Sequence, residues 1–243
     1  MSYALLIPAR DEAEALPLLF DRLGRVADAP ARIVVVDNGS TDDTAGVARD
    51  LGAEVVTEPR PGYGQACLAG IAHLRRQGAT PDALVFLDAD DFAAPAQLAV
   101  LLGPIETDAA DLVVGERTSP DERGVRWHAR LGNAFVVSVM RVRYGSTVRD
   151  MGPFRAIRWR SLALLGLDDR DYGWYVQMQV RALRAGLRVT GVTVEFERRS
   201  VGTSKVSGNP FASARAGWVM LRTLAVEVLR RGAPGQPRAD SNN

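Results

Sequence analysis

The stretch Ala83-Leu84-Val85-Phe86-Leu87-Asp88-Ala89-Asp90-Asp91 joins an apolar run directly to three acidic residues. The run at 84–87 is typical of a strand that is buried on both faces of a sheet. A buried strand cannot hold several carboxylates, so we expect the acidic residues to emerge at its C-terminal end, where open α/β sheets bind ligands. Asp88 and Asp90 flank a small residue and can turn toward one point. Their oxygen atoms suit Mg²⁺ or Mn²⁺, although a solvated acidic turn would have the same sequence.

Apolar segments and amphipathic helices alternate along the first half of the chain. The segments expected to form strands are 4–8, 32–37, 54–56, 84–87 and 112–115, and those expected to form helices are 14–26, 65–76 and 95–102. Short connections between them predict a mostly parallel sheet covered by helices on both faces. Right-handed crossovers bring the C-terminal ends of such strands to one side. Arg10, Glu12, Asp37 and Asp88 are therefore expected to converge at one edge.

The second half of the chain has a less regular pattern. We expect strands at 154–157 and 188–194, helices at 127–143, 175–185 and 211–231, a loop rich in serine, glycine and arginine at 198–208, and a disordered tail at 232–243. Arginines interrupt the apolar positions of the last helix. Such a helix can lie on an anionic membrane surface, or it can pack against the domain or a second subunit.

The composition limits the classes of function. Lys and Arg total 30 and Asp and Glu total 29, so the net charge of +1 creates no field that would favour nucleic acid. Cys67 is the only cysteine, which excludes an internal disulfide and a cysteine-based zinc site. The N-terminus has no signal sequence, and no apolar run is long enough to span a bilayer. We expect a cytoplasmic protein that is at most peripheral at the membrane.

The glycine pattern of a dinucleotide-binding protein is missing. The first predicted strand is not followed by Gly-x-Gly-x-x-Gly, and Gly62-Tyr63-Gly64 leads to Cys67 where the third glycine belongs. The polar residues fit a nucleotide-sugar site instead. Asp37 at a strand end can accept a hydrogen bond from the N–H edge of a base, or it can help to cap the next helix. Ser40 or Thr41 is the expected N-cap of that helix.

The diphosphate of a nucleotide sugar would lie between the acidic turn and a late basic loop. Asp88 and Asp90 would hold a divalent ion that bridges the phosphates and stabilises charge on the leaving nucleotide. Arg199 and Lys205 could close over the same phosphates. A solvated basic loop is the alternative for these last two residues.

Several motifs, in order, resemble glycosyltransferase family 2, which has the GT-A fold. The first group is Ile7-Pro8-Ala9-Arg10-Asp11-Glu12, Val36-Asp37-Asn38-Gly39-Ser40-Thr41-Asp42 and Leu87-Asp88-Ala89-Asp90. The second group is similar to the polyprenyl- or dolichyl-phosphate sugar transferases, and consists of Gly115-Glu116-Arg117, Arg130-Leu131-Gly132-Asn133, Asp150-Met151-Gly152-Pro153-Phe154-Arg155-Ala156, Tyr172-Gly173-Trp174 and Arg198-Arg199-Ser200-Val201-Gly202-Thr203-Ser204-Lys205. The resemblance covers nearly the whole chain to about residue 208.

This resemblance implies a role for each matching residue. Those implied to contact the base and ribose of the donor are Pro8, Arg10, Glu12 and Asp37. Those implied near the acceptor are Arg117, Arg130 and Asn133, and those on a closing loop are Arg199, Ser204 and Lys205. Asp88 and Asp90 would bind Mg²⁺ or Mn²⁺ and the diphosphate. The candidates for a catalytic role are Asp90, Asp150 and Arg199.

The sequence departs from the family pattern at two positions. Phe92 stands where many relatives carry a glutamine that ligates the metal, and Gln177 stands where relatives often carry a glutamate. Gln177 cannot act as a base, which leaves Asp150 and Asp171 for an alcohol acceptor. A lipid phosphate is already anionic near neutral pH and needs no base. The sequence therefore favours a phosphate acceptor. The transmembrane helices that often follow this domain in the family are also missing.

The chain is expected to form a single GT-A domain with a C-terminal helix. Its parts would be a nucleotide-binding half at 1–115, an acceptor half at 116–208, an amphipathic helix at 209–231 and a tail at 232–243. The preferred hypothesis is a metal-dependent inverting transferase that uses a UDP- or GDP-linked sugar and a polyprenyl phosphate. A soluble hydroxyl acceptor and a non-catalytic nucleotide-binding module are the alternatives. The C-terminal helix could also mediate a homo-oligomer.

Overall fold

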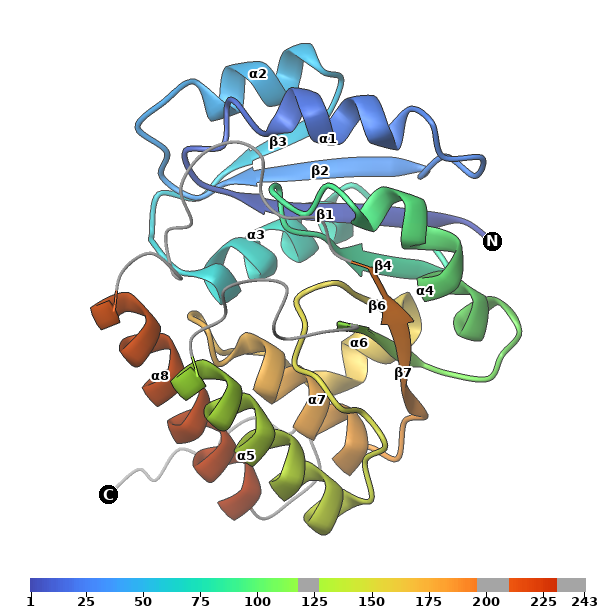
Figure 1. Cartoon of the computed structure of the whole chain (residues 1–243). Helices are drawn as coiled ribbons and strands as arrows, with labels where there is room; N and C mark the ends of the chain where they lie inside the picture. The colour runs from blue at the N-terminus through green and yellow to red at the C-terminus, as the bar shows by residue number, and fades with distance from the viewer. Residues whose placement is uncertain (118–126, 196–209, 231–243) are drawn as a thin grey trace, which may run out of the picture.

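A seven-stranded sheet forms the centre of the fold (Figure 1). The computed structural model describes residues 1–117, 127–195 and 210–230. The strands are β1 (Tyr3–Ala9), β2 (Arg32–Asp37), β3 (Glu54–Thr57), β4 (Ala83–Phe86), β5 (Leu112–Arg117), β6 (Arg155–Arg158) and β7 (Val189–Val194). They lie side by side in the order β3-β2-β1-β4-β6-β5-β7. Only β6 runs antiparallel to its neighbours, β4 and β5. The predicted mostly parallel sheet is confirmed.

Helices cover both faces of the sheet, as the sequence predicts. They are α1 (Leu16–Leu23), α2 (Thr44–Asp50), α3 (Tyr63–Arg76), the 3₁₀ helix η1 (Ala94–Gln97), α4 (Leu98–Glu106), α5 (Trp127–Tyr144), α6 (Trp159–Leu165), α7 (Trp174–Arg184) and α8 (Pro210–Leu229). Alternate strand residues divide the core into two layers. Leu6, Val36 and Phe86 pack with α3 and α7, whereas Leu5 and Val85 pack with α1 and α4.

The antiparallel strand β6 changes which residues reach the edge of the sheet where β4 ends. Its first residue, Arg155, pairs with Phe86, the last residue of β4. The loop that precedes β6 therefore lies beside the carboxyl ends of the parallel strands. The sequence predicted a short strand here but not its direction, and it did not predict α6 after it.

The expected N-cap of the helix after β2 is wrong. That helix, α2, begins at Thr44, and neither Ser40 nor Thr41 caps it. The backbone N–H of Asp11 donates to Ser40 Oγ at 2.9 Å, and Thr41 donates to the carboxylate of Asp11. These hydroxyls join the loops after β1 and β2, and so are not available to the helix.

The C-terminal helix α8 packs against α7 and α5. Leu224 and Glu227 on its inner side are buried. Among the residues that the structure describes, no helix combines the length and the apolar character that crossing a bilayer requires.

Candidate functional site

Several acidic side chains lie around Asp88, where the parallel strands of the sheet end. Glu12 follows β1, and Asp90 and Asp91 lie in the same turn as Asp88. Burial, and after it the negative charge of Asp90, raises the pKa of Asp88 to about 8; Asp91 and Glu12 add to the increase. Tyr63 opposes it by donating from its hydroxyl to Asp88 Oδ1 at 3.1 Å. Clustered negative charge of this kind is relieved by a bound cation, so the donor set fits a divalent metal ion.

The described part of the chain does not by itself enclose such an ion. Within residues 1–117, 127–195 and 210–230, no three side chains of His, Cys, Asp or Glu converge closely enough to hold a metal. Mg²⁺ is commonly held by one or two carboxylates, with substrate phosphates and water as the other ligands. Asp88 and Asp90 fit this pattern, in which the ion is held jointly by the protein and a diphosphate.

The residues predicted to bind the nucleoside lie around the ends of β1 and β2. Pro8 is partly buried within β1, Arg10 is exposed just beyond it, and Asp37 ends β2 with 8% of its surface exposed. Asp37 Oδ1 accepts a hydrogen bond from the backbone N–H of Ser40 at 3.0 Å. Burial raises the pKa of Tyr172, on which the charges of Arg10 and Asp88 also act. Arg10 and the acidic turn therefore share one region.

Asn38 is a residue of this region to which sequence reasoning gave no role. Its Nδ2 donates to the carbonyls of Glu58 at 3.0 Å and Arg60 at 2.7 Å, and its Oδ1 accepts from the N–H of Gly62 at 2.9 Å. These bonds fix the loop after β3 beside the end of β2. The position of Asn38 directly after Asp37 in a family motif was the available signal.

A buried aromatic and cationic group lies behind Asp88. The rings of Tyr63 and Tyr175 are 4.7 Å apart between centroids, and the guanidinium of Arg155 is 4.7 Å from the centroid of Tyr175. Arg155 is fully buried and donates to the carbonyls of Gly152 and Tyr175. Burial lowers the pKa of Arg155. Through Tyr63, this group supports the side chain of Asp88. Sequence reasoning assigned no role to any of the three residues.

Close backbone contact explains the glycine pair in Gly62-Tyr63-Gly64. A Cβ at Gly62 would lie 2.2 Å from the carbonyl oxygen of Arg170, and a Cβ at Gly64 would lie 2.2 Å from that of Asp169. The start of α3 and the 169–170 segment can approach this closely only without side chains at both positions. Tyr63 is thereby held where its hydroxyl reaches Asp88.

The structure brings two predicted acceptor-side residues, Arg117 and Asn133, close to the catalytic candidate Asp150. Arg117 at the end of β5 donates to both carboxylate oxygens of Asp150, from Nε and, at 2.7 Å, from Nη2. Asn133 Oδ1 accepts from the N–H of Met151 at 3.0 Å. Burial acts to raise the pKa of Asp150, but the hydrogen bonds from Arg117 hold it below its ordinary value.

The remaining predicted residues can be placed only in part. Arg130 belongs to α5, but its side chain is outside what the structure describes. Arg199, Ser204 and Lys205 lie outside the described residues altogether.

The side chain of Gln177, on α7, forms hydrogen bonds with the loop before α7 and with α8. Its Oε1 accepts from the N–H groups of Asp168 and Asp169, each at 2.8 Å. Its Nε2 donates to Asp168 Oδ1 at 2.8 Å and to Glu227 Oε1 at 3.1 Å. Arg181 also binds Glu227, at 2.8 Å. The amide therefore has a structural reason to replace a carboxylate at this position.

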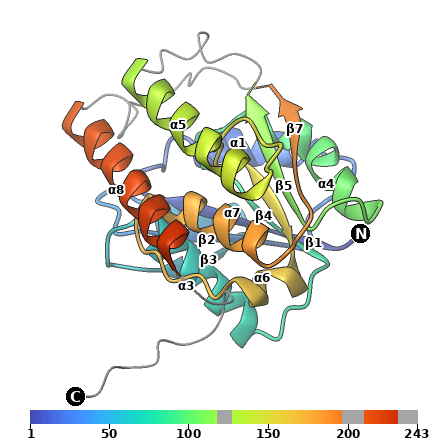
Figure 2. The ribbon, with the colours of Figure 1, turned by 90° about the horizontal axis from the view of Figure 1, so that it is seen from below.

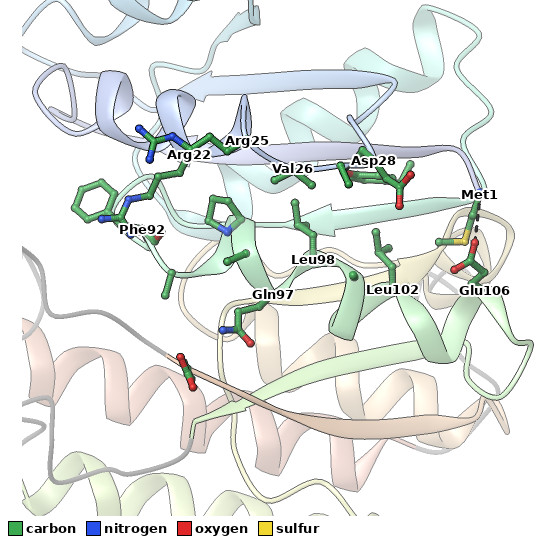
Figure 3. A pocket seen from close by; sticks show the side chains of 17 residues that line it. Met1, Arg22, Arg25, Val26, Asp28, Phe92, Gln97, Leu98, Leu102 and Glu106 are labelled. Atoms are coloured by element: carbon green, nitrogen blue, oxygen red, sulfur yellow. Dashed lines mark hydrogen bonds and ion pairs between the residues drawn. The ribbon is translucent and has the colours of Figure 1, made fainter.

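Phe92 anchors the acidic turn from behind. Only 2% of its surface is exposed, and it packs in the core beneath α1 and α4. Arg22 donates from Nη1 to the carbonyl of Phe92 at 2.9 Å, and its guanidinium lies 5.8 Å from the ring centroid. Figure 3 shows both side chains at one end of a cavity on this side of the sheet. Phe92 thus positions the turn through packing and a backbone contact.

Comparisons with known proteins identify the family of this chain. The model of the family "Glycosyl transferase family 2" matches residues 4–165. An uncharacterized glycosyltransferase of Mycobacterium tuberculosis is 39% identical over 207 residues, which cover 84% of this chain and 89% of the relative. An undecaprenyl-phosphate mannosyltransferase of Micrococcus luteus is 33% identical over 222 residues, covering 86% and 88%. A polyprenol monophosphomannose synthase of Mycolicibacterium smegmatis is 31% identical over 228 residues, covering 86% and 83%.

A solved structure supports the fold. The glucosyl-3-phosphoglycerate synthase of Mycobacterium tuberculosis, in complex with Mn²⁺, UDP-glucose and phosphoglyceric acid, superposes with a TM-score of 0.76. It is 21% identical, and the match covers 95% of this chain and 81% of the synthase. The chain belongs to glycosyl transferase family 2 and is a glycosyltransferase.

The raised pKa of Asp88 predicts a specific dependence of stability on pH. Because its pKa rises from 3.8 to about 8 on folding, the folded protein holds this proton more tightly. The stability that the protonated group provides is complete below the lower value and is lost as pH rises through the higher one, by at most about 1.4 kcal/mol per pH unit. Relative to Asp88→Asn, the metal-free wild type should lose unfolding free energy between about pH 5 and pH 8.

Urea unfolding of both proteins across this range measures the difference, and Mg²⁺ or Mn²⁺ should stabilise only the wild type. A constant difference between the two proteins would contradict the raised pKa.

The contacts of Gln177 predict that a glutamate, which the family resemblance implies at this position, is harmful here. Gln177→Glu would place a carboxylate against Glu227 and Asp168 in place of an amide donor. We expect a loss of about 1–3 kcal/mol in unfolding free energy, measured by chemical denaturation. Gln77→Glu, on the exposed end of α3, is the matched control and should change stability little. Equal stability of the two variants would refute the structural role of the amide.

Proposed function

We propose that this glycosyltransferase moves a sugar from a nucleoside diphosphate to a polyprenyl phosphate, with inversion and with a divalent metal ion. The observation that carries the proposal is the cluster of Glu12, Asp90 and Asp91 around Asp88, whose pKa it helps to raise. Two relatives above 30% identity are named for undecaprenyl-phosphate mannosyl transfer and polyprenol monophosphomannose synthesis. The similar synthase structures contain UDP with Mn²⁺ or Mg²⁺.

The nucleoside of a UDP- or GDP-linked sugar would bind across the ends of β1 and β2. Ser40 fixes Asp37 through Oδ1, and the second carboxylate oxygen can accept from the N–H edge of the base. Pro8 and Arg10 would face the base and ribose, and Glu12 the ribose side nearest Asp88. The half of the chain at 1–115 would thus bind the donor, and the half at 116–208 the acceptor.

The acidic turn would bind the diphosphate. Asp88 and Asp90 would hold a divalent ion that offsets the negative charge developing on the leaving diphosphate. Tyr63 orients the carboxylate of Asp88 by its hydrogen bond. Arg199, Ser204 and Lys205 would contribute further donors from the loop predicted at 198–208.

The acceptor side suits an anionic nucleophile. An acceptor phosphate oxygen would form a bond to the anomeric carbon as the bond from that carbon to the diphosphate oxygen breaks, and the electron pair would leave with the diphosphate. The second pKa of a phosphate ester is about 6, so the attacking oxygen has no proton to lose at neutral pH. Arg117 lies within electrostatic reach of Asp91, and Asp150 fixes its guanidinium. Arg117 and Arg130 would bind the acceptor phosphate.

A hydroxyl acceptor would require a base. The pKa of Asp150 is held below its ordinary value by Arg117, and Asp171 forms an ion pair with Arg215 at 2.5 Å. The lowered pKa favours the charged, weakly basic form of Asp150, and the ion pair with Arg215 engages the carboxylate of Asp171. These contacts support the phosphate acceptor over the alcohol.

Donor and metal binding can be measured together by thermal shift. UDP, GDP, dTDP and their sugars are tested with and without Mg²⁺ or Mn²⁺. One of the nucleotides should stabilise the wild type, by about 2.7 kcal/mol at a hundredfold excess over its Kd, and only when the metal is present. Asp88→Asn should lose this response, whereas Asp50→Asn on the exposed end of α2 should keep it. Equal stabilisation without metal would contradict the proposed metal dependence.

Transfer assays test the acceptor. A short, water-soluble isoprenyl phosphate, the corresponding isoprenol and soluble sugars are compared with the donor found by thermal shift. We expect transfer to the phosphate alone, and losses of roughly 10²–10³ in kcat for Asp88→Ala and Asp90→Ala.

Full activity of both variants would refute the metal site. Transfer to the alcohol would support a hydroxyl acceptor, and tight diphosphate binding with no turnover on any acceptor would support a binding module.

A further inference from the structure

We infer that the exposed sides of α5 and α8 form a docking surface for an anionic lipid bilayer. This inference rests on the proposed function, because a polyprenyl phosphate acceptor lies in a membrane. Figures 1 and 2 both show α5 and α8 side by side, outside α7, and the two helices are in contact. The exposed side chains of these two helices are together called the α5–α8 face below, and its large apolar members are Phe135, Val142, Trp218, Val226 and Leu229.

Large apolar side chains concentrate on this face. Of the nine that are exposed in the described part of the chain, five lie on α5 and α8. Val142 on α5 is 88% exposed, and Trp218 and Leu229 on α8 are 68% and 79% exposed. Exposed apolar clusters on a water-soluble domain are characteristic of interaction sites. A tryptophan on such a surface is typical of the water–membrane boundary.

The charges on the same helices have one sign. The segment Trp127–Tyr144 contains no Asp or Glu, and Pro210–Leu229 contains only Glu227. Glu227 is 1% exposed and bound to Arg181, so it contributes no acidic group to the surface. Arg141, Arg143 and Arg222 are exposed. Since the whole chain has a net charge of only +1, this positive surface is local, and it complements anionic lipid headgroups.

The α5–α8 face begins close to the loops that surround the proposed acceptor site. In the first half of α5, Asn133 binds the backbone of Met151, next to Asp150. In α8, Arg215 pairs with Asp171 at 2.5 Å, and Thr223 donates to Asp169 at 2.9 Å. A bilayer on the α5–α8 face would therefore place its headgroup layer beside the proposed acceptor site. A lipid phosphate could then react without leaving the membrane.

A second copy of the chain complements this face less well. In a symmetric dimer the same patch meets itself. The exposed Arg141, Arg143 and Arg222 would then face arginines, with no exposed acid on either helix to neutralise them. An anionic bilayer provides both an apolar interior and negative charge, and so matches both properties of the surface.

Vesicle flotation of the full chain, without donor or acceptor, tests the inference. The protein should float with phosphatidylglycerol vesicles and much less with phosphatidylcholine vesicles, and added salt should reduce flotation. Trp218→Ser and Leu229→Ser should each weaken binding by about tenfold or more. Arg222→Glu should weaken it by about fivefold or more, selectively for anionic vesicles.

Matched controls lie elsewhere on the surface. Val100→Ser on α4 and Leu164→Ser on α6 remove exposed apolar side chains, which are 48% and 54% exposed, and Arg76→Glu reverses an exposed charge on α3. These variants should float like the wild type, and thermal melts should show that all variants fold.

Two results with the variants would overturn the inference. The first is flotation that is the same for the face variants, the controls and the wild type. The second is a wild-type dimer in sedimentation experiments that Trp218→Ser converts to monomer, with no change in vesicle binding.

Activity on the short, water-soluble isoprenyl phosphate separates this inference from the proposed function. Face variants that lose vesicle binding but keep this activity support both. Vesicle binding with no transfer to any phosphate acceptor would overturn the proposed function and leave the docking surface standing. Transfer without vesicle binding by the wild type would overturn the docking surface alone.

Discussion

The carboxylate of Asp88 follows a strand that has no solvent-facing side. All four residues of β4 are buried, with β1 on one side and β6 on the other. A charged side chain can leave such a strand only at its end, since burying an unpaired carboxylate is costly. Glu12 and Asp90 reach the same place, and together with burial they raise the pKa of Asp88 to about 8. A bound cation would relieve the repulsion among these carboxylates.

The elements that could be predicted from the sequence are those with a strong apolar pattern. β1, β2 and β4 are buried runs that end in, or close to, a polar residue. Because these strands are parallel, the sequence predicted that Arg10, Asp37 and Asp88 lie at the same edge of the sheet. β6 was recognised as a strand but not as antiparallel, because a four-residue strand contains no signal of its direction. Arg155 at its start was not recognised as buried. An arginine normally indicates a surface position, and here carbonyl groups and the ring of Tyr175 accommodate it.

The two departures from the family pattern have different physical explanations. The ring of Phe92 packs in the core, where the resemblance implies a polar side chain. Arg22 binds the backbone carbonyl of the same residue. The acidic turn is thereby held from the core side. Gln177 provides donors and acceptors at once, which a carboxylate cannot do between Asp168 and Glu227. Neither contact could be read from the sequence, because each partner lies on another element of the fold.

The charge environment of Asp150 bears on the nature of the acceptor. A base must be able to accept a proton near neutral pH, so its carboxylate should be partly freed from positive charge. Asp150 has the opposite environment, since Arg117 binds both of its oxygens and holds its pKa low. The pair instead presents a guanidinium in a fixed orientation beside the acidic turn, with Asp91 within its electrostatic reach. A fixed guanidinium binds phosphate oxygens well. The pairing of Arg117 with Asp150 is therefore consistent with a phosphate acceptor, whose own negative charge makes a base unnecessary.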